Sequence, residues 1–337
     1  MCRLNKFLSI VFFLIFVNKS FALQFGNGTD ESTKKFIKVA DNVKDINLDF
    51  YSSFYISNDN CLYGTGFSIY KRFNLEGPEL QNSYVKLKDE VIYYEGNILK
   101  FSNGKTYSTF DTFQEISSDF VKCSFGLWLK SDNTLWCLGE NTHGAYGDGK
   151  KYSNYKDFHF LRDDVKDFFS NGYYTAILTV KNEVYISGEH YLPKPYKTTA
   201  TFFKLADNVR YLADGFYITN NNELFVFGWC ANGVSGLGNL GSQWQILPTK
   251  VMDNVLSVES NQQVTLIIKE NGDLYGCGGD TKNYYGELGF GDKKPVFIPK
   301  FIMSDVKKVS LGICQTAVLK NDGTLWMCGV NDFPGLM

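Results

Sequence analysis

Short apolar runs alternate with polar turns along most of the chain, and the final run shows the pattern clearly. Ala317-Val318-Leu319 precedes the polar turn Asn321-Asp322-Gly323, and Leu325-Trp326-Met327-Cys328-Gly329 follows it. Asn, Asp and Gly tolerate the left-handed torsions of a tight turn, and the β-branched or aromatic residues on either side favour strands. The pattern therefore predicts a β-hairpin.

The same pattern recurs at fairly regular intervals. Earlier copies close at residues 66, 110, 139, 188, 228 and 278, so that successive copies lie 44, 29, 49, 40, 50 and 51 residues apart. A third short strand is predicted upstream of each hairpin, and its first residue is in most copies Val43, Val121, Val165, Val209, Val255 or Val306. A period of roughly 30 to 50 residues with three or four strands per unit is typical of a β-propeller rather than of a helical solenoid.

Several units carry a second motif after the closing glycine. It reads Gly139-Glu140-Asn141-Thr142-His143-Gly144-Ala145-Tyr146-Gly147-Asp148-Gly149 in one unit and Tyr285-Gly286-Glu287-Leu288-Gly289-Phe290-Gly291-Asp292 in another, with a looser copy over residues 232–238. The two motifs together resemble RCC1-type repeats, and the resemblance covers nearly all of the chain. It implies an all-β fold, a seven-bladed β-propeller. The weakest unit surrounds Asn103-Gly104 and ends at Phe110 instead of a glycine.

The two ends of the chain complement each other. The last repeat stops at Gly329 and the few residues after it, half-way through its motif, whereas residues 24–28 resemble the missing half. Residues 35–40 then supply an outer strand. The sequence thus predicts one blade closed by the N- and C-termini, which leaves no free sheet edge in the ring.

The first 22 residues have the features of a secretory signal peptide. Arg3 and Lys6 precede an apolar run from Phe7 to Val17, and Ser20-Phe21-Ala22 resembles a cleavage site. We therefore expect a secreted protein cleaved after Ala22, with residues 23–337 forming a single propeller domain. No later stretch approaches the length of a membrane-spanning helix.

Composition narrows the possible partners. The chain has 29 Phe, 21 Tyr and 31 Gly, which suits many short strands with glycine turns. Its net charge of -2 offers no basic surface for a phosphate backbone, so we do not expect nucleic-acid binding. The mature cysteines show no zinc spacing, and we expect them to be small buried side chains with at most a pair or two oxidised.

Enzyme chemistry finds little support in the residues. A sialidase-like site needs three converging arginines, but the mature chain has only Arg72, Arg162 and Arg210, at blade boundaries or on outer strands. His143, His159 and His190 lack metal-ligand spacing, and no nucleophile elbow or phosphate loop is present. We expect no catalytic residues, no metal and no cofactor, and keep an extracellular carbohydrate-active enzyme of sialidase or lyase type as the alternative.

The resemblance also implies guanine-nucleotide exchange on a small nuclear GTPase, the activity of the founding member. A signal peptide and the short spacing between repeats, which leaves no room for a protruding wedge, argue against it. Binding of a protein or glycan by a monomeric propeller is the expected function. Trp128, Trp136 and Trp326 occupy core positions of the repeat, so the candidate binding patch consists of the loop aromatics Trp229, Trp244, Tyr284, Tyr285, Tyr191 and Tyr196.

Overall fold

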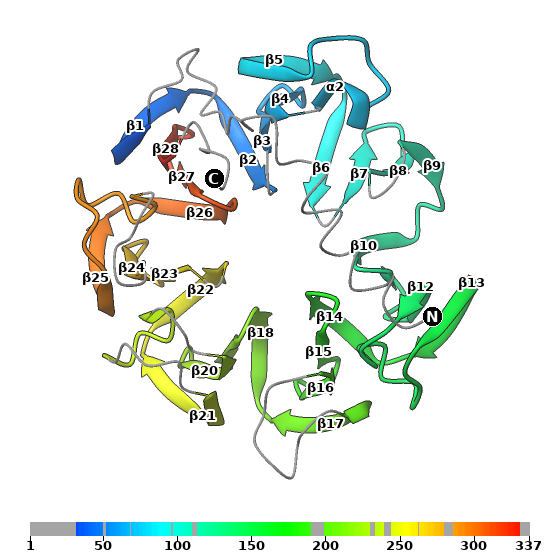
Figure 1. Ribbon diagram of the computed structural model, residues 1–337. Helices are drawn as coiled ribbons and strands as arrows, with labels where there is room; N and C mark the ends of the chain where they lie inside the picture. Colours follow the sequence, from blue (N-terminus) through cyan, green and yellow to red (C-terminus); the bar gives the residue numbers. More distant parts are fainter. Residues whose placement is uncertain are drawn as a thin grey trace, which may run out of the picture.

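Seven four-stranded antiparallel sheets form blades around a central axis (Figure 1). This computed structural model describes residues 32–49, 52–67, 69–95, 97–109, 113–189, 199–229, 233–238, 244–261, 263–279 and 286–330, without the side chains of residues 82, 229 and 244–246. The sequence-based prediction of an all-β, seven-bladed propeller is confirmed.

Each blade contains strands that are consecutive in the chain, except for the last. Blade 1 comprises β2 (Val43–Leu48), β3 (Ser52–Ser57), β4 (Leu62–Phe67) and β5 (Leu80–Lys88); blade 2 comprises β6 (Val91–Glu95), β7 (Ile98–Phe101), β8 (Thr106–Ser108) and β9 (Gln114–Ile116). Blade 3 comprises β10 (Phe120–Ser124), β11 (Leu127–Lys130), β12 (Leu135–Asn141) and β13 (Ser153–Arg162); blade 4 comprises β14 (Val165–Ser170), β15 (Tyr174–Thr179), β16 (Val184–Gly188) and β17 (Thr199–Ala206).

The remaining blades follow the same order. Blade 5 comprises β18 (Val209–Ala213), β19 (Phe216–Thr219), β20 (Leu224–Trp229) and β21 (Trp244–Met252), and blade 6 comprises β22 (Val255–Ser260), β23 (Val264–Lys269), β24 (Leu274–Gly278) and β25 (Val296–Met303). Blade 7 contains β26 (Val306–Leu311), β27 (Gln315–Lys320) and β28 (Leu325–Gly329), and its outer strand is β1 (Thr33–Ala40).

Blade 7 is closed by both ends of the chain, as the sequence predicts. Strand β1 pairs antiparallel with β28, with Ile37 opposite Met327 and Lys38 opposite Trp326. Figure 1 shows the first and last colours of the chain meeting in this blade. The predicted signal peptide and residues 24–28 lie outside the described residues.

The hairpin turns between the second and third strands have the predicted left-handed position. It is filled by Asn60, Asn133, Asn182 and Asn222, with φ between 59° and 67°, or by Gly104, Gly272 and Gly323. In six of the joints between blades, the carbonyl of this residue accepts a hydrogen bond of 2.7–2.9 Å from the first N–H of the next inner strand. Gly104 is the exception among the described residues, because the N–H of Phe120, which begins the next inner strand, donates instead to the Ser117 carbonyl at 3.3 Å. A Cβ added to Gly104 would meet no atom within 4 Å.

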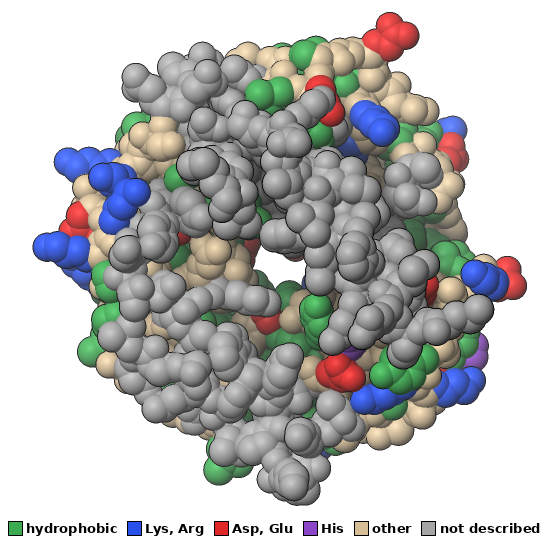
Figure 2. All heavy atoms as spheres, viewed as in Figure 1, with side chains coloured by type: hydrophobic (Ala, Val, Ile, Leu, Met, Phe, Trp, Pro, Cys, Tyr) green, Lys and Arg blue, Asp and Glu red, His purple; other side chains and the backbone are tan. Residues whose placement is uncertain are grey.

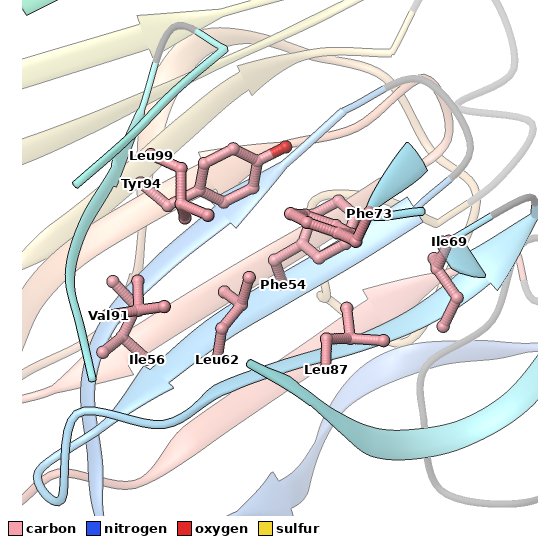
Figure 3. Close-up of a cluster of buried hydrophobic side chains, with 9 residues drawn as sticks. All are labelled: Phe54, Ile56, Leu62, Ile69, Phe73, Leu87, Val91, Tyr94 and Leu99. Atoms are coloured by element: carbon pink, nitrogen blue, oxygen red, sulfur yellow. The ribbon is translucent and has the colours of Figure 1, made fainter. Parts of the chain in front are cut away.

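Hydrophobic side chains fill the joints between neighbouring blades. The joint between blades 1 and 2 contains nine buried residues, among them Phe54, Phe73 and Tyr94, whose rings meet edge to face (Figure 3). Six of the seven clusters have seven to nine buried members within the described chain. The joint of blades 2 and 3 has four: Ile98, Phe120, Cys123 and Trp128.

The second motif of the repeat connects a blade to its successor. We call residues 144–149, 233–238 and 286–291 the glycine loops of blades 3, 5 and 6. The N–H of the last glycine of each loop donates to a carbonyl at the start of the next blade's outer strand: Gly149 to Ala200 at 2.8 Å, Gly238 to Phe297 at 2.9 Å and Gly291 to Lys34 at 2.7 Å. These bonds explain why the motif recurs.

The second residue of each glycine loop is also held by the next blade. Its carbonyl accepts a hydrogen bond from Ser187 Oγ at Ala145 (2.8 Å), from Thr265 Oγ1 at Val234 (2.9 Å) and from Thr316 Oγ1 at Glu287 (2.7 Å). Buried carbonyl groups without a partner are costly, so these hydroxyl groups fix the loop in place.

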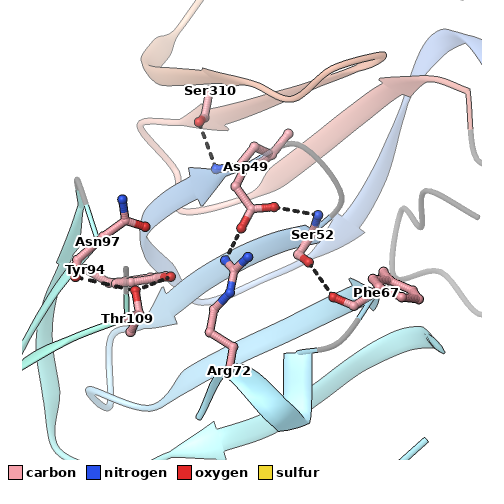
Figure 4. A network of polar contacts seen from close by, with 9 residues as sticks. Asp49, Ser52, Phe67, Arg72, Tyr94, Asn97, Thr109 and Ser310 are labelled. Carbon is pink, nitrogen blue, oxygen red and sulfur yellow. Dashed lines mark hydrogen bonds and ion pairs between the residues drawn. The ribbon is translucent and has the colours of Figure 1, made fainter. Parts of the chain in front are cut away.

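Blades 1 and 2 depart from this arrangement. In blade 1 a single turn of helix, α2 (Ile69–Arg72), follows β4 and is succeeded by the fully buried ring of Phe73. Arg72 pairs there with Asp49, whose carboxylate also accepts the N–H of Ser52 (Figure 4). In blade 2 only five residues separate β8 from β9.

One detail of the predicted repeat is wrong. Val121 was expected to open the inner strand of its unit, but the strand begins at Phe120, which pairs with Lys130 as Val165 pairs with Thr179 in blade 4. The larger ring contributes to the small core of this joint, where it packs edge to face on Trp128 at 5.2 Å.

Candidate binding face

The turn between the first and second strands and the connection between the third and fourth strands leave each blade on the same side of the ring. This follows from antiparallel pairing of consecutive strands in every blade. We call this side the loop face. It carries the glycine loops, helix α2 and the ends of β20 and β21 at which Trp229 and Trp244 lie.

The predicted aromatic patch can be placed only in part. Tyr191, Tyr196, Tyr284 and Tyr285 lie outside the described residues. Trp229 and Trp244 were assigned to a connecting loop, but Trp229 ends β20, Trp244 begins β21, and the two are direct cross-strand partners. Because neighbouring strands place such residues side by side, the structure brings together the backbones of the two tryptophans that the sequence singled out.

A second group of aromatic residues lies on the loop face of blades 3 and 4. Phe125, in the turn between β10 and β11, is 46% exposed, and Tyr173, in the turn between β14 and β15, is 54% exposed. The ring of His143, from the connection between β12 and β13, lies 4.5 Å from that of Tyr173. Phe125 in turn flanks Gly172, the neighbour of Tyr173. We call Phe125, His143 and Tyr173 the aromatic cluster.

Phe125 has an unusual backbone conformation. Its φ is 46°, and the following Gly126 also has positive φ, so the two form a tight hairpin turn. Among the described residues, twelve other non-glycine residues have positive φ, and nine of them are Asn. A left-handed conformation costs an L-residue with a bulky side chain roughly 1–2 kcal/mol. An exposed aromatic residue held at this cost is a candidate for function.

The histidine of the cluster is held by a carboxylate. His143 Nδ1 lies 2.8 Å from Glu189 Oε2, and Lys151 Nζ lies 3.5 Å from Glu189 Oε1. Glu189 is the last described residue before the segment that contains Tyr191 and Tyr196. Sequence reasoning treated His143 as an ordinary loop residue and missed Phe125 and Tyr173, although a Phe directly before Gly at a predicted tight turn was an available signal.

The central channel carries paired charges rather than a funnel of one sign. Figure 2 views the ring along its axis, with the opening in the middle. The third residue of the inner strand joins neighbouring blades in two ion pairs, Lys122–Asp167 and Lys308–Asp45, both at 2.8 Å. At the equivalent position of blades 2 and 5, Tyr93 and Tyr211 donate to backbone carbonyls of the next inner strand.

Two buried carboxyl groups lie at the joint of blades 6 and 7. Burial raises the pKa of Glu259 to about 7, although its bond from the Leu311 N–H and the charge of Lys308 act in the opposite direction. Burial likewise raises the pKa of Glu287 to about 8, and its Oε1 has no hydrogen-bond partner among the described residues. The Glu95 carboxylate also acts to raise the pKa of Glu259, whereas burial alone raises that of Glu287.

Arg72, Arg162 and Arg210 do not converge. Arg72 pairs with Asp49 in blade 1, Arg162 with Asp164 in blade 3, and Arg210 donates to Asn222 and to backbone carbonyls between blades 5 and 6. Burial alone would lower the pKa of Arg72, but the Asp49 carboxylate outweighs it and raises that pKa. The carboxylate-binding site of a sialidase requires three free guanidinium groups in one place, and the described structure has none.

The remaining histidine and cysteine residues form no catalytic or metal site in the part of the chain that the structure describes. His159 stacks on Tyr155 at 4.4 Å, and His190 lies outside the described residues. Cys123, Cys137, Cys277, Cys314 and Cys328 are buried, as expected, and Cys61 is half-buried. Within the described ranges, no group of His, Cys, Asp and Glu has the geometry of a metal site. None of the helices described there could cross a membrane.

Sequence comparison finds relatives for part of the chain. No family model matches. A segment of 121 residues, 34% of the chain, is 31% identical to the human X-linked retinitis pigmentosa GTPase regulator, and the mouse protein is 34% identical over 124 residues. The match spans only 12% of the length of these curated relatives.

Structural comparison covers almost the whole ring. The structure of Kap60 bound to yeast RCC1 (Prp20) superimposes with a TM-score of 0.64 over 86% of this chain and 80% of that chain, at 16% identity. The chain is an RCC1-like β-propeller. The RCC1-like propeller also resembles human WBSCR16, with a TM-score of 0.52, 15% identity and coverage of 87% of this chain and 78% of that one.

Proposed function

We propose that this RCC1-like propeller is a secreted, non-catalytic binding protein that recognises a protein or glycan through its loop face at blades 3 and 4. The observation that carries the proposal is Phe125, an exposed aromatic ring on a left-handed backbone beside Tyr173 and His143. Aromatic side chains with few rotatable bonds are favoured anchors in recognition.

Two further observations support binding over catalysis. The charges of the central channel are paired between blades, and the arginines are dispersed. The yeast relative Prp20 has been described with Kap60, Gsp1p and histones as binding partners, so propellers of this fold bind proteins. We carry over only that general property, because those partners were defined for another protein at 15–16% identity.

A test of this proposal separates binding from stability. In the Phe125→Asn/Tyr173→Asn variant, Asn replaces Phe at a left-handed position that Asn adopts elsewhere in this chain. We expect the free energy of unfolding to stay unchanged or to rise by up to about 1 kcal/mol, because the strain is relieved. Binding should fall at least tenfold. The mature chain and the variant would be compared on a glycan array and by affinity capture from extracellular material of the producing organism.

The matched control is Phe301→Asn, because Phe301 is also 46% exposed but lies on outer strand β25 of blade 6. It should bind as the unmodified chain does. If the double variant retained full binding, the aromatic cluster would not be the site; if the unmodified chain turned over an arrayed glycan, the enzyme alternative would replace the binding proposal.

Secretion has a direct test. We expect the exported protein to begin at Leu23, which intact-mass measurement of material from the culture medium would determine. Retention inside the cell with residues 1–22 intact would contradict this part of the proposal.

A further inference from the structure

The outer rim of the ring contains a recurring docking position. In the joints that follow blades 3, 5 and 6, a glycine loop packs onto the start of the next blade's outer strand. The residues that receive it are Phe202, Pro299 and Phe36, all half-buried. A Cβ added to Gly147 would lie 2.3 Å from the Phe202 ring, and one added to Gly289 would lie 2.2 Å from the Phe36 ring. Only glycine allows so close an approach.

The outer strand of blade 3 has the same local shape. Its pairing with β12 is interrupted between Cys137 and Gly139, just as β17 is interrupted opposite the segment from Ile186 to Gly188. His159 lies opposite Cys137 as Phe203 lies opposite Ile186, so Phe158 is the equivalent of Phe202. Counting back along the two strands in the same way makes Lys156 the equivalent of Ala200. The Ala200 carbonyl in blade 4 accepts a hydrogen bond from the N–H of Gly149.

Blade 2 has no glycine loop to place on this position. Its motif ends at Ser108, and β9 begins at Gln114. Phe158 is accordingly 44% exposed, and Phe160, two residues further on the same side of β13, is 45% exposed. Phe158 leans on Phe120 and Trp128, and Phe160 lies edge to face on Trp136 at 5.5 Å. We call Phe158, Phe160, Trp136 and the carbonyl of Lys156 the rim dock.

Residue 160 also departs from the repeat in a way that exposes apolar surface. In blade 6 the equivalent residue is also a phenylalanine, Phe301, but there blade 5 supplies a glycine loop. In four other blades the equivalent residue is a lysine: Lys38 in blade 7, Lys86 in blade 1, Lys204 in blade 4 and Lys250 in blade 5. Each of these lysines pairs with an Asp three residues later. Blade 3 retains an acidic residue there, Asp163, but has Phe at position 160. The solvent-facing lysine is thus replaced at the joint where the neighbouring blade leaves space.

We propose that the rim dock binds a glycine turn of a protein partner, of the form Gly-x-apolar-Gly-x-Gly. Three copies of the glycine contact within the molecule define the complementary chemistry; two of them carry the apolar residue, and Ser235 takes its place in blade 5. The central glycine would lie against Phe158, the N–H of the last glycine would donate to the Lys156 carbonyl, and the apolar side chain would extend the small core shared by blades 2 and 3. Tyr146 and Leu288, fully or almost fully buried, fill that place in the glycine loops of blades 3 and 6.

The chain supplies its own probe for this proposal. A cyclised, fluorescein-labelled peptide with the sequence of residues 141–150 would be titrated with the mature chain, and binding followed by fluorescence anisotropy. We expect saturable binding, at least tenfold weakening when the peptide carries Gly147→Val, and at least tenfold weakening with the Phe158→Ala protein. The Phe301→Ala protein should bind normally.

Two further variants of the chain control for misfolding and for binding at the aromatic cluster. Phe160→Lys restores the residue of the repeat, with Asp163 available to pair, and should weaken binding while the melting curve is unchanged. Phe125→Asn should leave peptide binding intact, since the aromatic cluster lies at blades 3 and 4 and the rim dock lies at the joint of blades 2 and 3. No detectable binding below about 1 mM, or binding that neither Phe158→Ala nor Phe160→Lys weakens, would overturn the proposal.

Discussion

The joint between blades 6 and 7 and the joint between blades 2 and 3 are built from the same repeat but held differently. The first has a turn-to-strand bond from Val306 to Gly272, a docked glycine loop and nine buried residues. The second lacks a bond from the Gly104 turn, receives no glycine loop and has four buried residues among those described. Aromatic packing around Trp128 replaces the turn-to-strand bond and the glycine loop, and a hydrogen bond of 3.4 Å from Tyr93 to the Val121 carbonyl also crosses the joint.

The difference shows that the two motifs of the repeat have separate tasks. The hairpin motif builds a blade, and blade 2 forms although its second motif is lost. The glycine motif connects a blade to the next one, so its loss weakens a joint without removing a blade. Blade 1 provides an intermediate case, in which α2 and Phe73 fill the space of a glycine loop.

Removing Trp128 should have the largest effect. The ring is 6% exposed and contacts Phe120 at 5.2 Å, in a joint with few other contacts. We expect Trp128→Ala to cost about 3–5 kcal/mol of unfolding free energy. Hydrogen exchange should also quicken selectively in β6–β9. Ile267→Ala, at the equivalent strand position of blade 6, should destabilise without selective exchange there. Equal exchange in the two variants would show that the joints do not differ.

Forcing a glycine loop out of its dock should have the next largest effect. Gly289 has φ of 71° and lies against the Phe36 ring, so Gly289→Val combines backbone strain with a clash. We expect a loss of about 2–4 kcal/mol in denaturant unfolding. Gly104→Val, with φ of 85° and an open surrounding, should cost only the strain, about 1 kcal/mol. Similar losses would mean that the loop contact adds no stability.

The joint of blades 6 and 7 should weaken as pH rises. The folded chain holds the proton of Glu287 up to about pH 8, whereas the unfolded chain loses it near the ordinary carboxyl value of 4.5. The contribution of Glu287 to the free energy of unfolding is therefore greatest below pH 4.5 and falls as pH approaches 8. One pKa unit corresponds to about 1.4 kcal/mol, so even half of this shift lowers the free energy of unfolding by about 2 kcal/mol between these pH values.

Glu287→Gln removes the titration and is expected to raise the free energy of unfolding at pH 8.5 while flattening its pH profile. Glu76→Gln, at an exposed position of blade 1, is the matched control and should leave the profile unchanged. A Glu287→Gln profile as steep as that of the unmodified chain would show that the carboxyl group is solvated in the folded state.

Breaking the channel ion pairs should have the smallest effect. Lys308→Met and Lys122→Met each remove one pair whose side chains are about a third exposed. We expect about 0.5–1 kcal/mol for each, reduced at high salt. Lys122 belongs to the joint that follows blade 3, where a glycine loop is docked, so its loss should not quicken exchange in β10. Thermal melts at two salt concentrations would check this.

The blade count, the hairpin turns and the shared terminal blade could be predicted because each is written in local residue patterns. Asn at positions 60, 133, 182 and 222 identifies its turn wherever the blade lies. The aromatic cluster and the rim dock could not be predicted in that way. Phe158 is exposed because of what blade 2 lacks, and Phe125 meets Tyr173 only once two blades stand side by side. The cross-strand pairing of Trp229 with Trp244 spans fourteen residues with no turn motif to fix the register.

The pairing of β1 with β28 determines when during synthesis blade 7 can form. The strand synthesised first among those described is the one that must wait longest for its neighbour, because nearly the whole chain separates them. At ordinary rates of roughly 5–20 residues per second, β1 remains without its partner strand for tens of seconds. Its Phe36 and Lys34, which will later receive the glycine loop of blade 6, stay uncovered over that interval. The ring is therefore completed only once β28 has been synthesised, and a truncated product that lacks β28 leaves β1 without its partner strand.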